Sequence, residues 1–186
     1  ELMGALGVLA GSLFKIGNDL RLLSSGPRTG LGEITLPSLQ PGSSIMPGKV
    51  NPVIPEMVIQ AAVYVQGKAV SVGQGAASAP LELNIMMPLV AYETLDALSL
   101  LTHTCRALDK RCIRGIEANR ERCAQQVEWS LALVTPLATR IGYDQAAQLA
   151  YRAYRENKTV RQVVIESGLL SKEEADAVLD PRSMLG

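Results

Sequence analysis

The stretch GSSIMPGKVNP, residues 42–52, interrupts a chain that is otherwise rich in helix-forming residues. Pro47 and Pro52 exclude a continuous helix through it, because proline removes a backbone donor and clashes with the preceding turn. Gly42 and Gly48 allow unusual backbone angles and a close approach to a ligand. We therefore expect an irregular loop that carries hydroxyls, a cation and an amide.

On both sides of this loop, apolar residues recur at the heptad spacing of long helices packed nearly parallel to one another. Helices are expected over 1–24, 56–73 and 84–114, with a long irregular connection over 27–53 and a small-residue break over 73–80. The only strand candidate is weak and covers 33–37. The residues expected on the three buried seams are Leu2, Leu6, Leu9, Leu13, Ile16, Leu20 and Leu23; Val58, Ala62, Val65, Ala69 and Val72; and Leu95, Leu98, Thr102, Cys105, Leu108 and Cys112.

The helix pattern of the sequence changes near Gly115, and the helices expected after it are shorter. The sequence predicts an all-α fold in which residues 1–115 form part of a central helical-bundle domain and residues 116–186 form a small helical domain. Because the first seam starts at the second residue and the chain does not begin with methionine, we also expect a fragment of a longer protein. Helix caps are expected at Asn119 for a helix to about Val134, at Asp144, and at Thr159 and Ser171, with capping boxes to Gln162 and Glu174.

Composition excludes several classes of function. The 18 basic and 18 acidic residues balance, so neither nucleic acid nor an anionic membrane is an expected partner. No apolar run reaches the ~18 residues that span a bilayer. The cysteines lack CxxC spacing and His103 is the only histidine, so we expect no metal site, no cofactor and a reduced, cytoplasmic protein.

The loop resembles the signature GSSxMPxKxNP of the fumarase/aspartase superfamily. The segments SGPRTGLGEI (25–34), LELN (81–84), GIEANRE (115–121) and SLALVTPLATRIGYD (130–144) follow the order of that family. The resemblance implies an all-helical protein whose central domain assembles into a homotetramer, with each active site drawing on three subunits. The signature is matched at Gly42, Ser43, Ser44, Met46, Pro47, Lys49, Asn51 and Pro52.

The resemblance also implies the chemistry, which is removal of a proton beside a carboxylate and expulsion of a group from the adjacent carbon. Ser43 is the implied base, and Ser44 is implied as a hydrogen-bond donor. Lys49 and Asn51 would bind substrate and stabilise the aci-carboxylate, since preorganised donors and a cation act best in a water-poor site. Glu56 matches a glutamate that pairs with a histidine this chain lacks, although an acid in a first helical turn is also favoured by the helix dipole.

The residues around the signature favour an aspartate ammonia-lyase, because Pro-Glu follows NPV and GIEAN replaces the fumarase form GIEPN. A fumarase that converts malate into fumarate is the first alternative, and a non-catalytic helical oligomerisation module is the second. We expect a small dicarboxylate substrate (aspartate/fumarate) and a homo-oligomer. The 186-residue chain alone is expected to be inactive.

Overall fold

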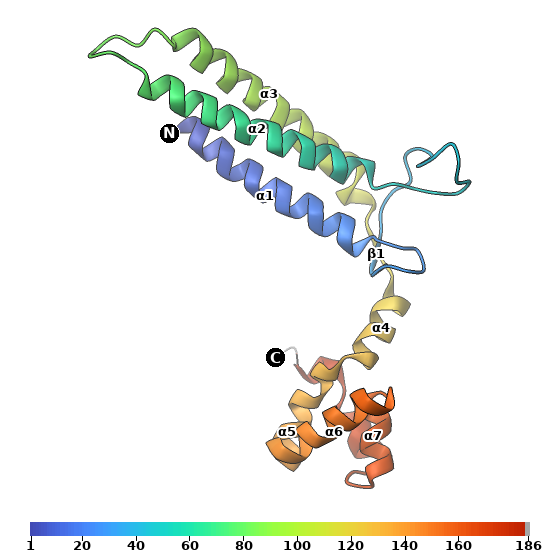
Figure 1. Cartoon of the computed structure of the whole chain (residues 1–186). Helices are drawn as coiled ribbons and strands as arrows, with labels where there is room; N and C mark the ends of the chain where they lie inside the picture. The colour runs from blue at the N-terminus through green and yellow to red at the C-terminus, as the bar shows by residue number, and fades with distance from the viewer. Residues whose placement is uncertain (185–186) are drawn as a thin grey trace. The chain divides into compact units, whose positions relative to one another are not determined.

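The computed structural model of the chain describes residues 1–184. Helices dominate this part and its one sheet has two short strands, so the predicted all-α fold class is confirmed (Figure 1). None of the helices in the described part is long and apolar enough to cross a membrane. The elements are α1 (Leu2–Leu23), β1 (Ile34–Thr35), α2 (Val53–Ala77), α3 (Met87–Arg111), η1 (Ile113–Gly115), β2 (Glu117–Ala118), α4 (Arg120–Trp129), η2 (Leu131–Leu133), α5 (Val134–Ile141), α6 (Tyr143–Glu156), α7 (Val160–Ser167), α8 (Lys172–Val178) and η3 (Pro181–Met184).

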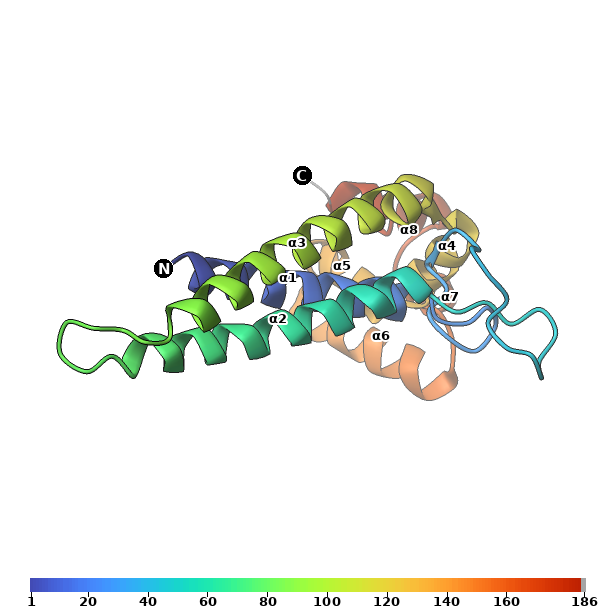
Figure 2. The same ribbon diagram turned by 90° about the horizontal axis from the view of Figure 1, so that it is seen from above.

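The chain divides into two compact units, residues 1–119 and residues 120–186. In the first unit the long helices lie side by side, with α1 against α2 and α2 against α3 (Figures 1 and 2). The predicted helix over 1–24 and the predicted seam of α2 are confirmed. The buried core of this unit consists of Met3, Leu6, Ala10, Leu13, Leu20, Val58, Ala62, Val65, Val72, Ala97, Leu101, Leu108 and Cys112.

The predicted seam of α1 is only half right. Leu2, Leu9 and Ile16 are 55%, 43% and 42% exposed. The buried line instead alternates leucines with small residues such as Ala10 and Gly17. A Cβ at Gly17 would lie 2.9 Å from Ile59 Cγ1 and 3.1 Å from the Pro55 carbonyl oxygen, so α1 approaches α2 closely where no side chain intervenes.

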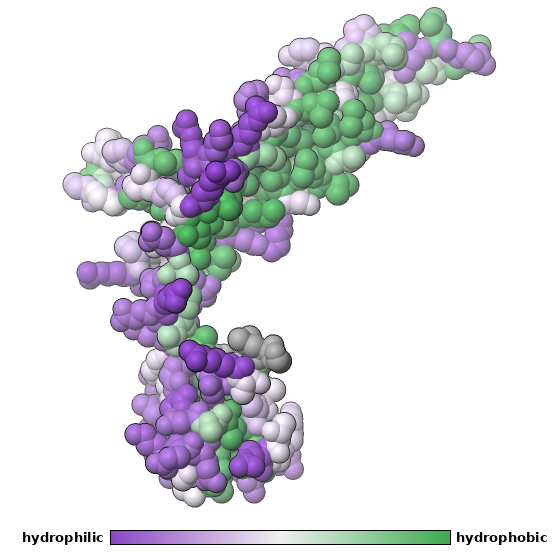
Figure 3. Space-filling view, turned by 180° about the vertical axis from the view of Figure 1, so that it is seen from behind, coloured by the Kyte–Doolittle hydropathy of each residue, from purple (hydrophilic) through white to green (hydrophobic). Residues whose placement is uncertain are grey.

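The predicted seam of α3 is partly confirmed. Leu108 and Cys112 are buried, and Leu98 and Cys105 pack half-buried against the core. The seam is wrong at Leu95, which is 67% exposed, and at Thr102, because the buried line there passes through Ala97, Leu101 and Thr104. Figure 3 shows a broad hydrophobic surface over the long helices.

The break between α2 and α3 lies further along the chain than predicted, at 78–86 instead of 73–80. Helix α2 continues to Ala77, because Gly75 packs into the turn that follows, with a hypothetical Cβ 3.5 Å from Met86 Cβ. Helix α3 begins at Met87 rather than at Asn84. The Asn84 side chain accepts the Met86 N–H (2.7 Å) and donates to the Gly75 carbonyl (3.2 Å), so it holds a turn instead of entering the helix.

The long connection between α1 and α2 is fixed near its start by the small sheet. Strand β1 pairs antiparallel with β2, which confirms the strand candidate, and the Asn119 N–H donates to the Glu33 carbonyl (2.9 Å). Next to the sheet, a Cβ at Gly115 would lie 2.5 Å from Pro37 Cγ, so the backbone at residue 115 packs directly on that proline. Residues 42–52 therefore connect the segment that is anchored by this sheet with the first turn of α2.

The second unit contains short helices around a separate core. Both predicted capping boxes are confirmed, Thr159 with Gln162 and Ser171 with Glu174. Arg161 joins three segments, because its guanidinium contacts Glu128 (3.0 Å), Asp176 (2.5 Å) and a backbone carbonyl near the end of the chain. The buried core of this unit consists of Leu133, Leu137, Ala146, Leu149, Ala153, Val160, Val163, Val164, Ala175 and Leu179.

Two predicted boundaries in this unit are wrong. The helix after Asn119 ends at Trp129 rather than near Val134, because a 3₁₀ turn intervenes before α5. Asp144 lies inside the first turn of α6 and does not cap it. Gly142 is the N-cap, and its φ of +85° makes the break between α5 and α6.

The buried hydroxyl of Thr104 gives a test of packing in the first unit. Its Oγ1 has no hydrogen-bond partner among residues 1–184, and the side chain is 2% exposed. We expect Thr104→Val to raise the free energy of unfolding by about 1 kcal/mol, because a methyl group carries no unsatisfied polar atom. Thr94→Val is the matched control and should not stabilise, since Thr94 Oγ1 donates to the Val90 carbonyl (2.7 Å). Thermal unfolding of both variants measures the effect, and a loss of stability in Thr104→Val would contradict it.

Candidate active site

The signature loop is closed at its neck by backbone and side-chain hydrogen bonds. The Gly42 N–H donates to the Lys49 carbonyl (2.6 Å), and Asn51 Nδ2 donates to the Gly42 carbonyl (3.0 Å). A Cβ at Gly42 would lie 2.8 Å from the Lys49 carbonyl oxygen and 2.9 Å from the Asn51 nitrogen. Glycine at position 42 is thus required by the close approach of the two sides of the loop.

Ser43 stands at the start of the turn that this neck encloses. Its Oγ accepts the backbone N–H groups of Ile45 (3.1 Å) and Met46 (3.2 Å), and the residue is half-buried. Two N–H donors directed at one oxygen favour a negative charge on that oxygen. These two contacts are the ones that the structure gives to the predicted serine base.

The predicted substrate ligands Ser44 and Lys49 are both exposed. Within residues 1–184, neither side chain takes part in a hydrogen bond or an ion pair. The segment 42–52 contains no acidic residue, so Lys49 gives it a net positive charge. Both groups are therefore available to a ligand that reaches the loop.

Asn51 and Glu56 occupy the other end of the site. The Asn51 amide already donates to the Gly42 carbonyl and so closes the loop. The same side chain would also have to make the predicted contact with substrate. Glu56 is half-buried in the first turn of α2, where its N–H donates to the Pro52 carbonyl (3.1 Å). Helix α2 begins at Val53, so its positive N-terminal end directly follows the loop.

The structure thus brings the backbone of the predicted residues close together in the loop, but it does not bring all of their side chains together. Hydrogen bonds join Gly42, Lys49 and Asn51 at the neck, and Ser43 follows Gly42 in the chain. The tip projects apolar side chains into solvent, with Ile45 87% exposed. Among residues 1–184, no three His, Cys, Asp or Glu side chains lie close enough together to hold a metal ion.

Sequence reasoning missed a buried charge cluster on α2 and α3. Lys68 is only 5% exposed, and its Nζ forms ion pairs with Glu93 and Asp96 (2.9 Å to Asp96). The same ammonium lies over the rings of Tyr64 (4.5 Å) and Tyr92 (5.5 Å). Hydrogen bonding to Glu93 raises the pKa of Lys68 above its ordinary value, so the lysine is charged despite its burial. Its place on the face of α2 that includes Val65 and Val72 was the signal available in the sequence.

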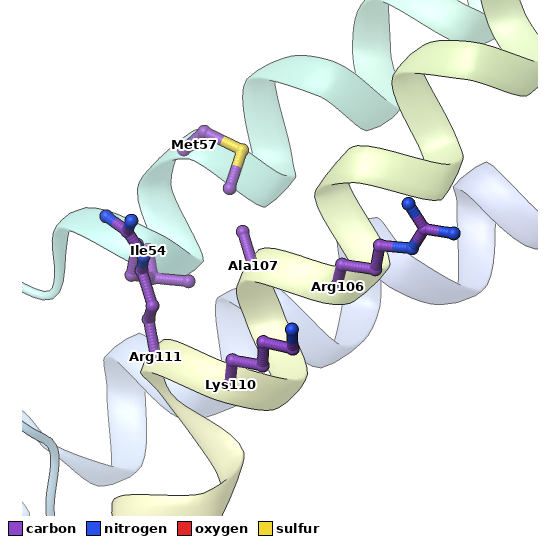
Figure 4. A pocket seen from close by; sticks show the side chains of 6 residues that line it. All are labelled: Ile54, Met57, Arg106, Ala107, Lys110 and Arg111. Atoms are coloured by element: carbon purple, nitrogen blue, oxygen red, sulfur yellow. The ribbon is translucent and has the colours of Figure 1, made fainter.

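A second missed feature is a hollow between the first turn of α2 and the end of α3 (Figure 4). Its volume is about 390 Å³. Nothing in the residue spacing of either helix points to it, because its walls come from segments about 50 residues apart in the sequence. Its lining consists of Ile54, Met57, Arg106, Ala107, Lys110 and Arg111.

Comparisons with known proteins agree with the fold and with the signature loop. Residues 1–67 match the Lyase family, and residues 133–186 match the family Fumarase C C-terminus. The chain is 49% identical to the class II fumarate hydratase of Mycobacterium tuberculosis over 99% of its length, and 41% identical to the aspartate ammonia-lyase of a Bacillus species over 99%.

A crystal structure of fumarate lyase:delta crystallin from Brucella melitensis bound to cobalt superposes with a TM-score of 0.94 and 48% identity, over 99% of this chain and 40% of that one. The chain spans 40% of the Mycobacterium relative and 39% of the Bacillus relative. The two family matches and these likenesses cover the signature loop and both units. This chain belongs to the fumarase/aspartase superfamily of lyases.

Proposed function

We propose that residues 1–186 belong to a class II fumarate hydratase, which interconverts malate with fumarate and water. The comparisons support this alternative better than the aspartase that the sequence favoured, because the relative named fumarate hydratase is 49% identical and the relative named aspartate ammonia-lyase is 41% identical. The short motifs that favoured aspartase thus carry less weight than identity over the whole chain.

The observation that carries the proposal is the pair of backbone N–H groups donated to Ser43 Oγ. In the proposed reaction, Ser43 as an alkoxide takes the proton from C3 of malate, the carbon next to the C4 carboxylate. The electron pair of that C–H bond moves into this carboxylate and gives a doubly charged aci-carboxylate. The pair then returns to form the C2–C3 double bond, while the C2 hydroxyl accepts a proton from a general acid, proposed to be the histidine that pairs with Glu56, and leaves as water.

The remaining predicted residues have proposed roles around this intermediate. The Lys49 ammonium stabilises the added negative charge, and Ser44 donates a hydrogen bond to the substrate. Asn51 keeps the loop closed and offers its amide to a substrate carboxylate. Glu56 pairs with a histidine from the part of the family fold that this chain does not span, and no cofactor or metal takes part.

We also propose that the exposed apolar faces of the long helices pack against other copies in a homotetramer, as the family resemblance implies. Leu95 (67% exposed) and Leu9 (43% exposed) lie on such faces. Burying apolar surface of this kind is the main favourable term in obligate assembly. The sequence proposes a central bundle domain followed by a small C-terminal helical domain. The exposed apolar faces of the long helices belong to the first of these.

The proposed function is tested by offering L-malate and L-aspartate to a whole protein that contains these residues. We expect fumarate to form from malate and not from aspartate, as measured by the ultraviolet absorbance of the new double bond. The 186-residue chain alone serves as the control and should form no fumarate, because it lacks the proposed histidine. Fumarate formed from aspartate with release of ammonia would establish the aspartase instead, for which the Bacillus relative is the specific support.

A further inference from the structure

The hollow at the junction of α2 and α3 has one apolar wall and one basic wall. Ile54 and Met57, both half-buried, belong to the first turns of α2. Arg106, Lys110 and Arg111 come from the last turns of α3 and are exposed. Figure 4 shows Met57 and Ala107 pointing toward each other, with the long basic side chains extending from the α3 side.

The positive charge in this hollow is only partly offset within the described part of the chain. Across residues 1–184, no hydrogen bond or ion pair engages the side chains of Arg106, Lys110 or Arg111. The acid nearest to them in sequence is Asp109, and Arg114 holds its carboxylate through Nε (3.1 Å to each oxygen) and Nη2 (2.8 Å). That contact lowers the pKa of Asp109, and the charge of Lys110 lowers it further, so Asp109 offsets Lys110 only in part.

The negative end of the α3 helix dipole accounts for only some of these basic residues. Basic residues in the last turn of a helix stabilise its negative end, which accounts for Lys110 and Arg111. Arg106 lies a full turn earlier and receives no such benefit. The opposite wall is the first turn of α2, whose helix dipole is positive at that end and favours an anion, although the same turn contains the acidic Glu56.

We propose that this hollow binds a small organic anion with at least two negative charges on an apolar body. The charged groups face Arg106, Lys110 and Arg111, since guanidinium and ammonium groups recognise phosphates and carboxylates alike. The apolar body lies on Ile54 and Met57. A volume of about 390 Å³ suits a ligand of metabolite size. Neither Ser43 nor Lys49 lines the hollow, so this inference does not depend on the proposed function.

The direct test is calorimetric titration of a whole protein that contains these residues with three probes. Phenyl phosphate and isophthalate each combine two negative charges with an aromatic body, and inorganic phosphate lacks that body. We expect saturable one-to-one binding of phenyl phosphate or isophthalate, about tenfold tighter than inorganic phosphate because of the buried ring. Which of the two binds identifies a phosphate or a dicarboxylate as the natural group, and the affinity should fall as salt is added.

Variants locate the binding. Replacing Arg106, Lys110 and Arg111 together by glutamine should weaken binding at least about tenfold, whereas Arg106→Lys with Arg111→Lys should retain more of it. Lys15→Gln removes an exposed cation of the same unit, paired only with Asp19, and should have no effect. Circular dichroism and thermal unfolding establish that each variant is folded.

Three results would overturn the proposal. The first is no saturable binding of either aromatic probe at millimolar concentration. The second is equal affinity for inorganic phosphate and the aromatic probes, which would remove the apolar wall from the site. The third is unchanged binding in the folded triple glutamine variant, which would place the anion elsewhere. Ser43→Ala should leave the binding of the probes unchanged, so a failure here is distinguishable from a failure of the proposed function.

Discussion

Replacing Ser43 by alanine in a whole protein that contains these residues is expected to lower turnover of malate by about 10²–10⁴-fold, the range for removal of a general base. The hydroxyl is the proposed base, and its Oγ is the atom on which two backbone N–H groups converge. The Kd for malate should change far less, because Lys49 and the neck of the loop remain. Thermal stability should also be retained, since Ser43 lies in a loop outside both cores.

Ser44→Ala is the matched control for this variant. Ser44 is the adjacent hydroxyl in the same loop, it is exposed, and within residues 1–184 it accepts no N–H group. Its loss should reduce turnover much less than the loss of Ser43. If Ser43→Ala kept more than about a tenth of wild-type turnover, an effect below ~1.4 kcal/mol, Ser43 would not be the base.

Gly42→Ala is expected to reduce turnover by about 10²-fold, because displacing a catalytic group by about 1 Å can cost that much. The new Cβ would lie 2.8 Å from the Lys49 carbonyl oxygen, which is the acceptor of the Gly42 N–H. The neck must open to admit it, and Ser43, the next residue, moves with it. The expected result is a catalytic loss with an unchanged melting temperature, measured by steady-state kinetics and thermal unfolding.

Gly73→Ala is the control for the effect of an added methyl group. Gly73 lies within α2, where a Cβ would meet no atom within 4 Å, and alanine is the better helix former. This variant should keep full activity and be slightly more stable. A Gly42→Ala variant as active as Gly73→Ala would show that the closed neck is not required for catalysis.

Local signals in the sequence predicted the parts of the fold that depend on few residues. The capping boxes at Thr159 and Ser171 involve one hydroxyl and one side chain three positions later, and both form. The seam of α2 was also predicted, because this central helix contacts α1 on one side and α3 on the other and buries its whole stripe. The loop was predicted from its prolines and glycines.

Features that depend on which helices meet were not predictable from one sequence. In α3, only packing against the bundle selects Ala97 for the core and leaves the predicted Leu95 exposed. The hydrogen bonds to Ser43 Oγ depend on the backbone path of the turn, which no residue pattern specifies. The basic hollow needs the start of α2 beside the end of α3, so neither Ile54 nor Arg106 indicates it alone.

The central claim is that the signature loop of a malate–fumarate lyase stabilises an aci-carboxylate. A nitronate is planar and carries two negatively charged oxygens, as the aci-carboxylate does, when it replaces that group in a hydroxylated substrate analogue. The most direct measurement is therefore the Kd of such a nitronate beside the Kd of L-malate, for a whole protein that contains these residues. Tighter binding of the nitronate by at least about 10²-fold is predicted, as for transition-state analogues. A nitronate that binds no tighter than malate would contradict the account.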